Sequence, residues 1–196
     1  MDVPLRAVCV FCGSNAGARP EYRASATRLG TLLGSNGIDV VYGGASVGLM
    51  GAVADAALAA GGRVVGVIPR RLVDRELAHP GLAELHVTES MHERKALMSD
   101  LSDGFVALPG GFGTLEELAE VTTWAQLGLH RKPIGVLNVT GYFDLLLEFA
   151  GRMVADGFLS AEHRRLLITA TTAEDLLRGL QTFHAPVTEK WLPPQP

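Results

Sequence analysis

Short apolar runs alternate with amphipathic stretches from one end of the 196-residue chain to the other. Strand-like runs fall at residues 7–12, 39–42, 64–68, 84–88, 104–108, 134–139 and 166–169. Helical spacing of apolar residues falls at 21–35, 49–60, 92–101, 115–127, 143–156 and 173–182. Parallel strands need such crossovers, and near-continuous Val/Ile runs such as 63–68 suit strands covered on both faces. The order therefore predicts an α/β, Rossmann-like doubly wound sandwich, with a mostly parallel sheet of about seven strands flanked by helices.

The length suits one domain with a substantial core, and 47% hydrophobic against 19% charged residues indicates a globular chain. We expect a single domain over 1–184 and an irregular, proline-rich tail over 185–196. Residues 69–82 form the longest segment without a clear period. That segment is a candidate active-site loop.

Charge and hydropathy limit the partners. Seventeen basic and 21 acidic residues give a formal net charge of −4, so nucleic acid is not expected as a partner. Apolar runs fall short of the roughly 18 residues that cross a bilayer, and the N-terminus lacks a signal-peptide pattern. We expect a cytoplasmic protein without membrane contact.

Cys9 and Cys12 have a Cys-x-x-Cys spacing, but they lie inside the first apolar run. In a strand, positions i and i+3 face opposite sides, so the two sulfur atoms should diverge. The six histidines are scattered along the chain and do not pair at a metal-ligand spacing. We therefore assign no metal and no cofactor.

Three glycine-bearing turns follow predicted strands, at 12–15, 43–51 and 109–113. In an open parallel sheet, ligands bind outside the carboxyl ends of the strands, so the three turns should meet at one edge. The Gly-x-Gly-x-x-Gly pattern does not follow the first strand, which disfavours a dinucleotide. One phosphate or one small nucleotide fits better. Glycine after a buried strand can also be only a tight corner.

The third turn reads Pro109-Gly-Gly-Phe-Gly-Thr-Leu-Glu-Glu117 and opens an amphipathic stretch. Unpaired N–H groups of a helix's first turn would hold an anion, and Glu117 would serve a reacting centre beside it. The same residues also fit a capping box, with Thr114 as the N-cap and Glu117 reaching back to its N–H. Both interpretations predict a helix start at this turn.

With Met91-His-Glu-Arg-Lys95, Cys12-Gly-Ser14, Tyr42-Gly-Gly44, Arg75-Glu-Leu77 and Thr123-Trp-Ala-Gln-Leu-Gly128, this turn resembles the Lonely Guy (LOG) family. These are cytokinin riboside 5′-monophosphate phosphoribohydrolases, often labelled lysine decarboxylases, and their signature is Pro-Gly-Gly-x-Gly-Thr-x-x-Glu. The similarity runs to about residue 182. It implies hydrolysis of the N-glycosidic bond of N6-modified AMP, with AMP as a further candidate, to free base and ribose 5-phosphate.

By the same resemblance, Arg94 and Glu117 are the catalytic pair. Glu76, Lys95, Gly111, Phe112, Gly113, Thr114, Leu115, Glu116 and Thr123 would contact substrate, and Ser14, Gly44 and Gly110 from the glycine turns complete the expected binding set. Phe112 stands where the family often has tyrosine. The alternative for Arg94 and Lys95 is a solvated basic stripe on a helix, and for Glu76 a loop carboxylate in a charge run.

Two other classes compete with the hydrolase. One is a nucleotide-binding or sensing module of the same fold, which would not need both Arg94 and Glu117. The other is a pyridoxal phosphate decarboxylase, for which Lys95, Lys132 and Lys190 are the available lysines. The resemblance also implies a homodimer, with Trp124 and Leu127 able to meet a partner. Ordinary core packing would explain these two side chains as well.

Overall fold

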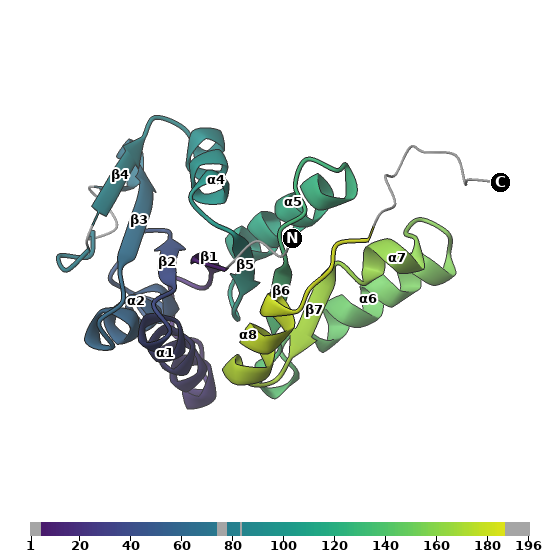
Figure 1. Cartoon of the computed structure of the whole chain (residues 1–196), viewed down its shortest axis with the longest axis horizontal. Helices are drawn as coiled ribbons and strands as arrows, with labels where there is room; N and C mark the ends of the chain where they lie inside the picture. The colour runs from purple at the N-terminus through teal and green to yellow at the C-terminus, as the bar shows by residue number, and fades with distance from the viewer. Residues whose placement is uncertain (1–4, 74–77, 83, 187–196) are drawn as a thin grey trace.

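A seven-stranded sheet forms the centre of the structure, a computed structural model that describes residues 5–73, 78–82 and 84–186 (Figure 1). The strands are β1 (Ala7–Phe11), β2 (Asp39–Tyr42), β3 (Val64–Pro69), β4 (Glu84–Thr88), β5 (Gly104–Ala107), β6 (Ile134–Leu137) and β7 (Leu167–Ala170). They lie in the order β4-β3-β2-β1-β5-β6-β7, and every neighbouring pair is parallel. The predicted fold class is confirmed.

Helices cover both faces of the sheet (Figure 1). One face packs against α1 (Pro20–Ser35), α2 (Gly48–Ala59) and α8 (Ala173–Gln181), and the other against α4 (Met91–Asp100), α5 (Phe112–Gln126) and α6 (Asp144–Ala155). The short helices α3 (Arg70–Val73) and α7 (Ala161–Arg164) and the 3₁₀ turn η1 (Val139–Gly141) complete the described elements. Among the described helices, none has the length and apolarity needed to cross a bilayer.

Alternate side chains of β1 enter two separate cores. Val8 and Val10 belong to the cluster under α1, α2 and α8, whereas Cys9 and Phe11 belong to the cluster under α4 and α5. Cys12 lies with the first cluster, so the two cysteines face opposite sides of the sheet, as predicted. Both thiols are buried and free, and burial raises the pKa of each.

The structure differs from the sequence prediction at the start of α5 and in two short helices that were not predicted, α3 and α7. Helix α5 begins at Phe112, three residues before the predicted start at Leu115. Within the segment 69–82, the structure places α3 at Arg70–Val73, while residues 74–77 lie outside the described part of the chain. Helices α3 and α7 have four residues each, which is too few to show a helical period in the sequence.

The sheet order places β1 between β2 and β5. The chain adds β2, β3 and β4 on one side of β1 and then adds β5, β6 and β7 on the other side. In doubly wound sheets, this switch point opens a crevice at the carboxyl ends of the two strands. The turns after β1 and β5 are the first and third glycine turns of the sequence. The backbone ties them together, because the Gly13 N–H donates to the Pro109 carbonyl oxygen at 3.1 Å.

Candidate active site

A cavity of about 320 Å³ opens at this switch point. Seven of the predicted site residues line it: Ser14, Arg94, Gly111, Phe112, Gly113, Thr114 and Glu117. They come from the turn after β1, from α4 and from the start of α5. The structure thus brings together, in one hollow, both predicted catalytic side chains and the predicted anion cradle.

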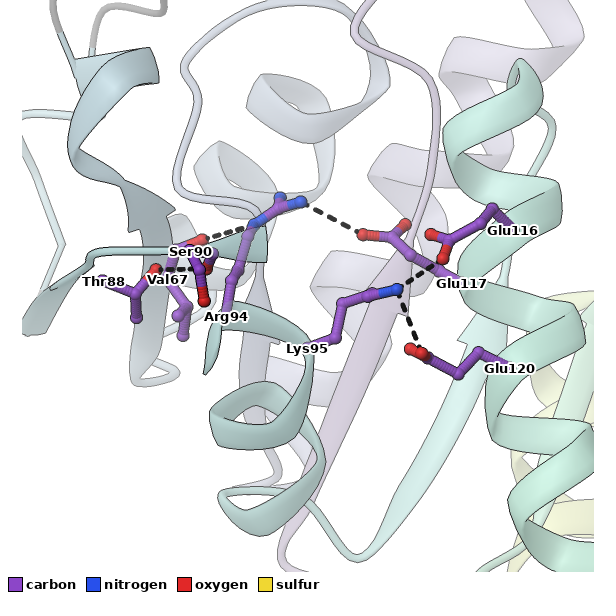
Figure 2. A network of polar contacts seen from close by, with 8 residues as sticks. All are labelled: Val67, Thr88, Ser90, Arg94, Lys95, Glu116, Glu117 and Glu120. Carbon is purple, nitrogen blue, oxygen red and sulfur yellow. Dashed lines mark hydrogen bonds and ion pairs between the residues drawn. The ribbon is translucent and has the colours of Figure 1, made fainter. Parts of the chain in front are cut away.

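The start of α5 decides between the two interpretations of the Pro109–Glu117 turn. The N-cap residue is Gly111, without a side-chain hydrogen bond, so Thr114 is the third residue of the helix. The alternative interpretation, a capping box with Thr114 as N-cap, is therefore wrong. Glu117 lies in the second turn and is buried, with its carboxylate directed at α4 rather than at its own helix end (Figure 2).

A side-chain cap is found instead at the start of α4. Ser90 Oγ accepts the Glu93 N–H at 3.1 Å at the start of α4, and the Glu93 carboxylate accepts the Glu89 N–H at 2.9 Å. This cap fixes the first turn of α4, from which Arg94 projects. The first turn of α5 instead leaves its N–H groups without a side-chain cap, beside the cavity. Such groups favour an anion.

Arg94 and Glu117, which both line the cavity, form an ion pair (Figure 2). Arg94 Nη1 lies 3.3 Å from Glu117 Oε1, and Arg94 Nε donates to the Val67 carbonyl oxygen at 2.9 Å. The side chains are 10% and 11% exposed, so Arg94 is not part of a solvated stripe. Gly43 makes room for the guanidinium, since a Cβ atom there would lie 2.4 Å from Arg94 Nη2.

Burial raises the pKa of Glu117 to about 7, although the charge of Arg94 opposes that shift. The carboxylate therefore changes charge close to neutral pH. A carboxyl group with such a pKa is suited to general acid–base work and to stabilising a developing positive charge. Perturbed carboxyl groups in clefts are typical of catalytic sites.

Lys95 is also buried, but its ammonium group faces two other carboxylates of α5 (Figure 2). Lys95 Nζ forms ion pairs with Glu116 and, at 3.0 Å, with Glu120. Burial lowers the pKa of this ammonium group, but the hydrogen bonds that it donates to both carboxylates, together with their negative charges, outweigh burial and raise the pKa overall. Lys95 and Glu116 thus join α4 to α5 beside the catalytic pair and do not line the cavity.

Four further predicted contacts lie away from the cavity lining. Gly110 and Leu115 line a separate apolar cavity on the other side of the turn, and Gly44 packs near Ile68 and Leu85. Thr123 is exposed on α5, where its hydroxyl donates to the Ala119 carbonyl oxygen at 2.8 Å. Glu76 lies outside the described residues.

Comparison with known proteins identifies the family of this site. A family model described as "possible lysine decarboxylase" matches residues 50–180. The cytokinin riboside 5′-monophosphate phosphoribohydrolase LOG7 of Arabidopsis thaliana is 49% identical over 179 residues, 91% of this chain and 82% of the relative. LOG1 of the same plant is 47% identical over 183 residues, with coverages of 93% and 86%. The chain belongs to the LOG family.

Solved structures agree on the fold of this LOG family member. A molybdenum cofactor binding protein from Rippkaea orientalis superposes with a TM-score of 0.67 at 21% identity, covering 89% of this chain and 94% of that one. The Moco carrier protein of Chlamydomonas reinhardtii gives 0.68 at 20% identity, with coverages of 91% and 96%. At this identity the likeness concerns the architecture alone.

Several lining residues of this LOG-family cavity were not in the predicted site. They are Val10, Phe11, Cys12, Gly13, Gly43, Met50, Leu72 and Met98. Gly43 had a partial signal, because it is the neighbour of the predicted Gly44. Cys12, Gly13 and Met50 lie within the predicted glycine turns, and Leu72 lies within the candidate loop 69–82. Val10 and Phe11 belong to a strand and Met98 to a helix, where the sequence pattern indicates only packing. Glu120, which pairs with Lys95, likewise lacked a motif.

Proposed function

We propose that this LOG family member hydrolyses the N-glycosidic bond of cytokinin riboside 5′-monophosphates, giving free base and ribose 5-phosphate. The observation that carries the proposal is the buried Arg94–Glu117 pair beside the uncapped start of α5. It occurs in a chain about half identical to proteins named for this activity. N6-modified AMP is the proposed substrate, and AMP is a further candidate.

The 5′-phosphate would bind at the first turn of α5. The N–H groups of residues 111–114 and the positive end of the helix dipole favour a dianion there. Ser14 lines the same cavity from the turn after β1 and adds a hydroxyl donor. Binding of the phosphate restrains the ribose, so that the anomeric carbon is held in one orientation relative to the catalytic carboxylate.

Glu117 would act on the sugar. Cleavage breaks the C1′–N bond, and the electron pair leaves with the base while positive charge grows on C1′ and the ring oxygen. An ionised carboxylate stabilises that charge and orients a water molecule, and it accepts one proton of this water as the water oxygen bonds to C1′. The leaving base takes a proton or a hydrogen bond. Arg94 cannot supply this proton as an acid, because guanidinium stays charged, so its role is electrostatic.

A product assay tests the proposal. The purified protein is incubated with isopentenyladenosine monophosphate, AMP, GMP and CMP, and free base and ribose 5-phosphate are quantified by chromatography. We expect release from the N6-modified nucleotide and its loss in Glu117→Gln. Saturable nucleotide binding without product over hours would instead establish the binding-module alternative.

The lysine contacts argue against the decarboxylase label. A Schiff base requires a neutral amine, but the Lys95 ammonium is held charged by Glu116 and Glu120. Lys132 Nζ donates to the Ser99 carbonyl oxygen at 2.8 Å, away from the cavity. Lys190 lies outside the described residues. An absorbance band of bound pyridoxal phosphate in the purified protein would reverse this conclusion.

We also infer a homodimer that uses α5. Leu115 on this helix and Leu127 at its C-cap are 39% and 42% exposed, and Leu129 just beyond them is 70% exposed. Trp124 packs partly against the core of its own chain. Because Thr123 lies outside the cavity of its own chain, a substrate contact from it would serve the neighbouring copy. Light scattering should give twice the chain mass for the wild type and less for Leu127→Arg.

A further inference from the structure

Tyr142 contacts the signature turn from outside the catalytic cavity. Its hydroxyl donates to the Gly110 carbonyl oxygen at 2.5 Å, from a residue 32 positions away. Tyr142 follows η1, between β6 and α6, and so belongs to the neighbouring crossover of the sheet. The family signature does not include it, and the catalytic pair does not touch it.

The turn that Tyr142 contacts is a thin wall between two cavities. Gly111, Phe112 and Thr114 line both the catalytic cavity and an apolar cavity of about 350 Å³. Tyr142, Phe143 and Leu146 form the far side of that apolar cavity. A wall with open space on either side depends strongly on the hydrogen bonds at its edges for its position.

Two hydrogen bonds hold consecutive carbonyl groups of this wall from opposite neighbours. The Gly13 N–H donates to the Pro109 oxygen from the β1 side, and the Tyr142 hydroxyl donates to the Gly110 oxygen from the β6 side. The turn is also tightly packed at Gly110, where a Cβ atom would lie 2.1 Å from Thr114 Oγ1. Losing either bond would free one peptide plane of the turn.

The loop that carries Tyr142 is itself firmly placed. Asn138 is buried, its side-chain amide donates to Asp144 Oδ1 at 2.7 Å, and its Oδ1 accepts the Phe143 N–H at 2.7 Å. The Tyr142 ring packs edge-on against Phe143, at 5.0 Å between centroids, and against Tyr22, at 5.5 Å. These contacts hold the ring independently of its hydroxyl.

We propose that Tyr142 is a positioning residue for the anion cradle. The described peptides are trans, so a C=O and the N–H of the next residue point to opposite sides. When Tyr142 holds the Gly110 C=O, it turns the Gly111 N–H away from itself, toward the side of the catalytic cavity. One cradle donor is thereby pre-oriented for a phosphate before the ligand arrives. The ligand's identity as a phosphate monoester rests on the proposed function.

Tyr142→Phe tests this role, because it removes the hydroxyl and keeps the ring contacts. Binding of ribose 5-phosphate and of adenine is measured by calorimetry, and KM and kcat are measured with isopentenyladenosine monophosphate. We expect the Kd for ribose 5-phosphate and the KM to rise about threefold to tenfold, the range of one lost hydrogen bond. The Kd for adenine and kcat should stay within about twofold. Tyr22→Phe, which alters the ring packed against Tyr142, is the matched control and should resemble the wild type.

The binding measurements test this inference separately from the proposed function. If the wild type binds ribose 5-phosphate but releases no base, the proposed function fails, and a weaker Kd in Tyr142→Phe still supports the positioning role. An unchanged Kd in Tyr142→Phe overturns that role. So does a wild type that binds neither ribose 5-phosphate nor inorganic phosphate. An equal loss of affinity for adenine and ribose 5-phosphate, with a lower Tm, would assign the hydroxyl to stability alone and also overturn it.

Discussion

Arg94 and Glu117 form a buried ion pair that joins α4 to α5, 3.3 Å apart in space and 23 positions apart in sequence. The Val67 carbonyl oxygen holds the guanidinium from the other side, at 2.9 Å from Nε. A planar fork can satisfy both partners at once, whereas an ammonium is a point charge. The pair therefore combines a fixed positive charge with a carboxylate that titrates near neutrality.

Replacing Arg94 with lysine tests whether the shape of the cation matters. Arg94→Lys keeps the charge but cannot bond to Val67 and Glu117 together, so we expect kcat/KM to fall about 100-fold. Steady-state kinetics with the N6-modified nucleotide measures this. Arg152→Lys is the control, because that exposed side chain of α6 pairs with Asp156 at the C-cap of the same helix. Activity of Arg94→Lys close to wild type would mean that charge alone suffices.

The pH dependence of kcat/KM should follow Glu117. The pKa of its carboxyl is raised to about 7, mainly by burial. Since the ionised form is the one that stabilises positive charge and orients water, activity should rise with pH through about 7 and level off above it. Initial rates over about pH 5 to 9 give the profile. A rate that falls with rising pH through the same midpoint would make the protonated carboxyl the active form.

The titration of Glu117 should also affect folding stability, but in the opposite direction: the free energy of unfolding should fall as pH rises, whereas activity rises. The Glu117 pKa is about 7 in the folded chain and near the ordinary value of 4.5 in the unfolded chain, so between these two pH values the folded chain binds the extra proton. The free energy of unfolding must then fall as pH rises from about 4.5 to about 7, by an amount on the order of 3 kcal/mol. Denaturant unfolding of the wild type and Glu117→Gln gives their difference at each pH. A pH-independent difference would contradict the raised pKa.

Gly43→Ala should disturb the Arg94–Glu117 ion pair by a steric clash with Arg94. A Cβ atom there would lie 2.4 Å from Arg94 Nη2 and 2.9 Å from Met50 Sδ, so the guanidinium must move away from its position. Because this clash is with the end of a flexible side chain, we expect a stability loss of about 1 kcal/mol but at least a tenfold lower kcat. Gly151→Ala in α6 is the control, since a Cβ atom there meets nothing within 4 Å. Unchanged kinetics in Gly43→Ala would show that the guanidinium position is not critical.

The fold was predictable because a parallel sheet repeats one pattern. Buried strands such as β3, with all six residues buried, read as continuous apolar runs, and their order alone implies crossovers. The meeting of the glycine turns at one edge followed from the same rule. The site was thus located from sequence to within its three turns, and the structure placed Ser14, Gly111 and Glu117 in one cavity.

What the sequence could not determine depends on side-chain direction. The Thr114-x-x-Glu117 spacing suits a cap, but a helix start shifted to Phe112 turns Glu117 inward. Nothing local distinguishes Gly43 from Gly44 as the glycine beside Arg94, because the distinction arises from α4 packing across β3. Tyr142 is near the site only because β5 and β6 are neighbours in the sheet. Such contacts between crossovers carry no local signal.

The paired charges of Lys95 and Glu120 should move the Glu117 titration in opposite directions. Burial is the main cause of the raised pKa of Glu117; the positive charge of Lys95 lowers this pKa, and the negative charge of Glu120 raises it further. Lys95→Gln should therefore shift the midpoint of the kcat/KM profile to higher pH, and Glu120→Gln should shift it to lower pH. Lys132→Gln, which loses a bond to the Ser99 carbonyl oxygen, is the control and should leave the midpoint in place. If Lys95 instead contacts substrate directly, its replacement will raise KM without moving the midpoint, because its charge then acts on the ligand and not on the carboxylate.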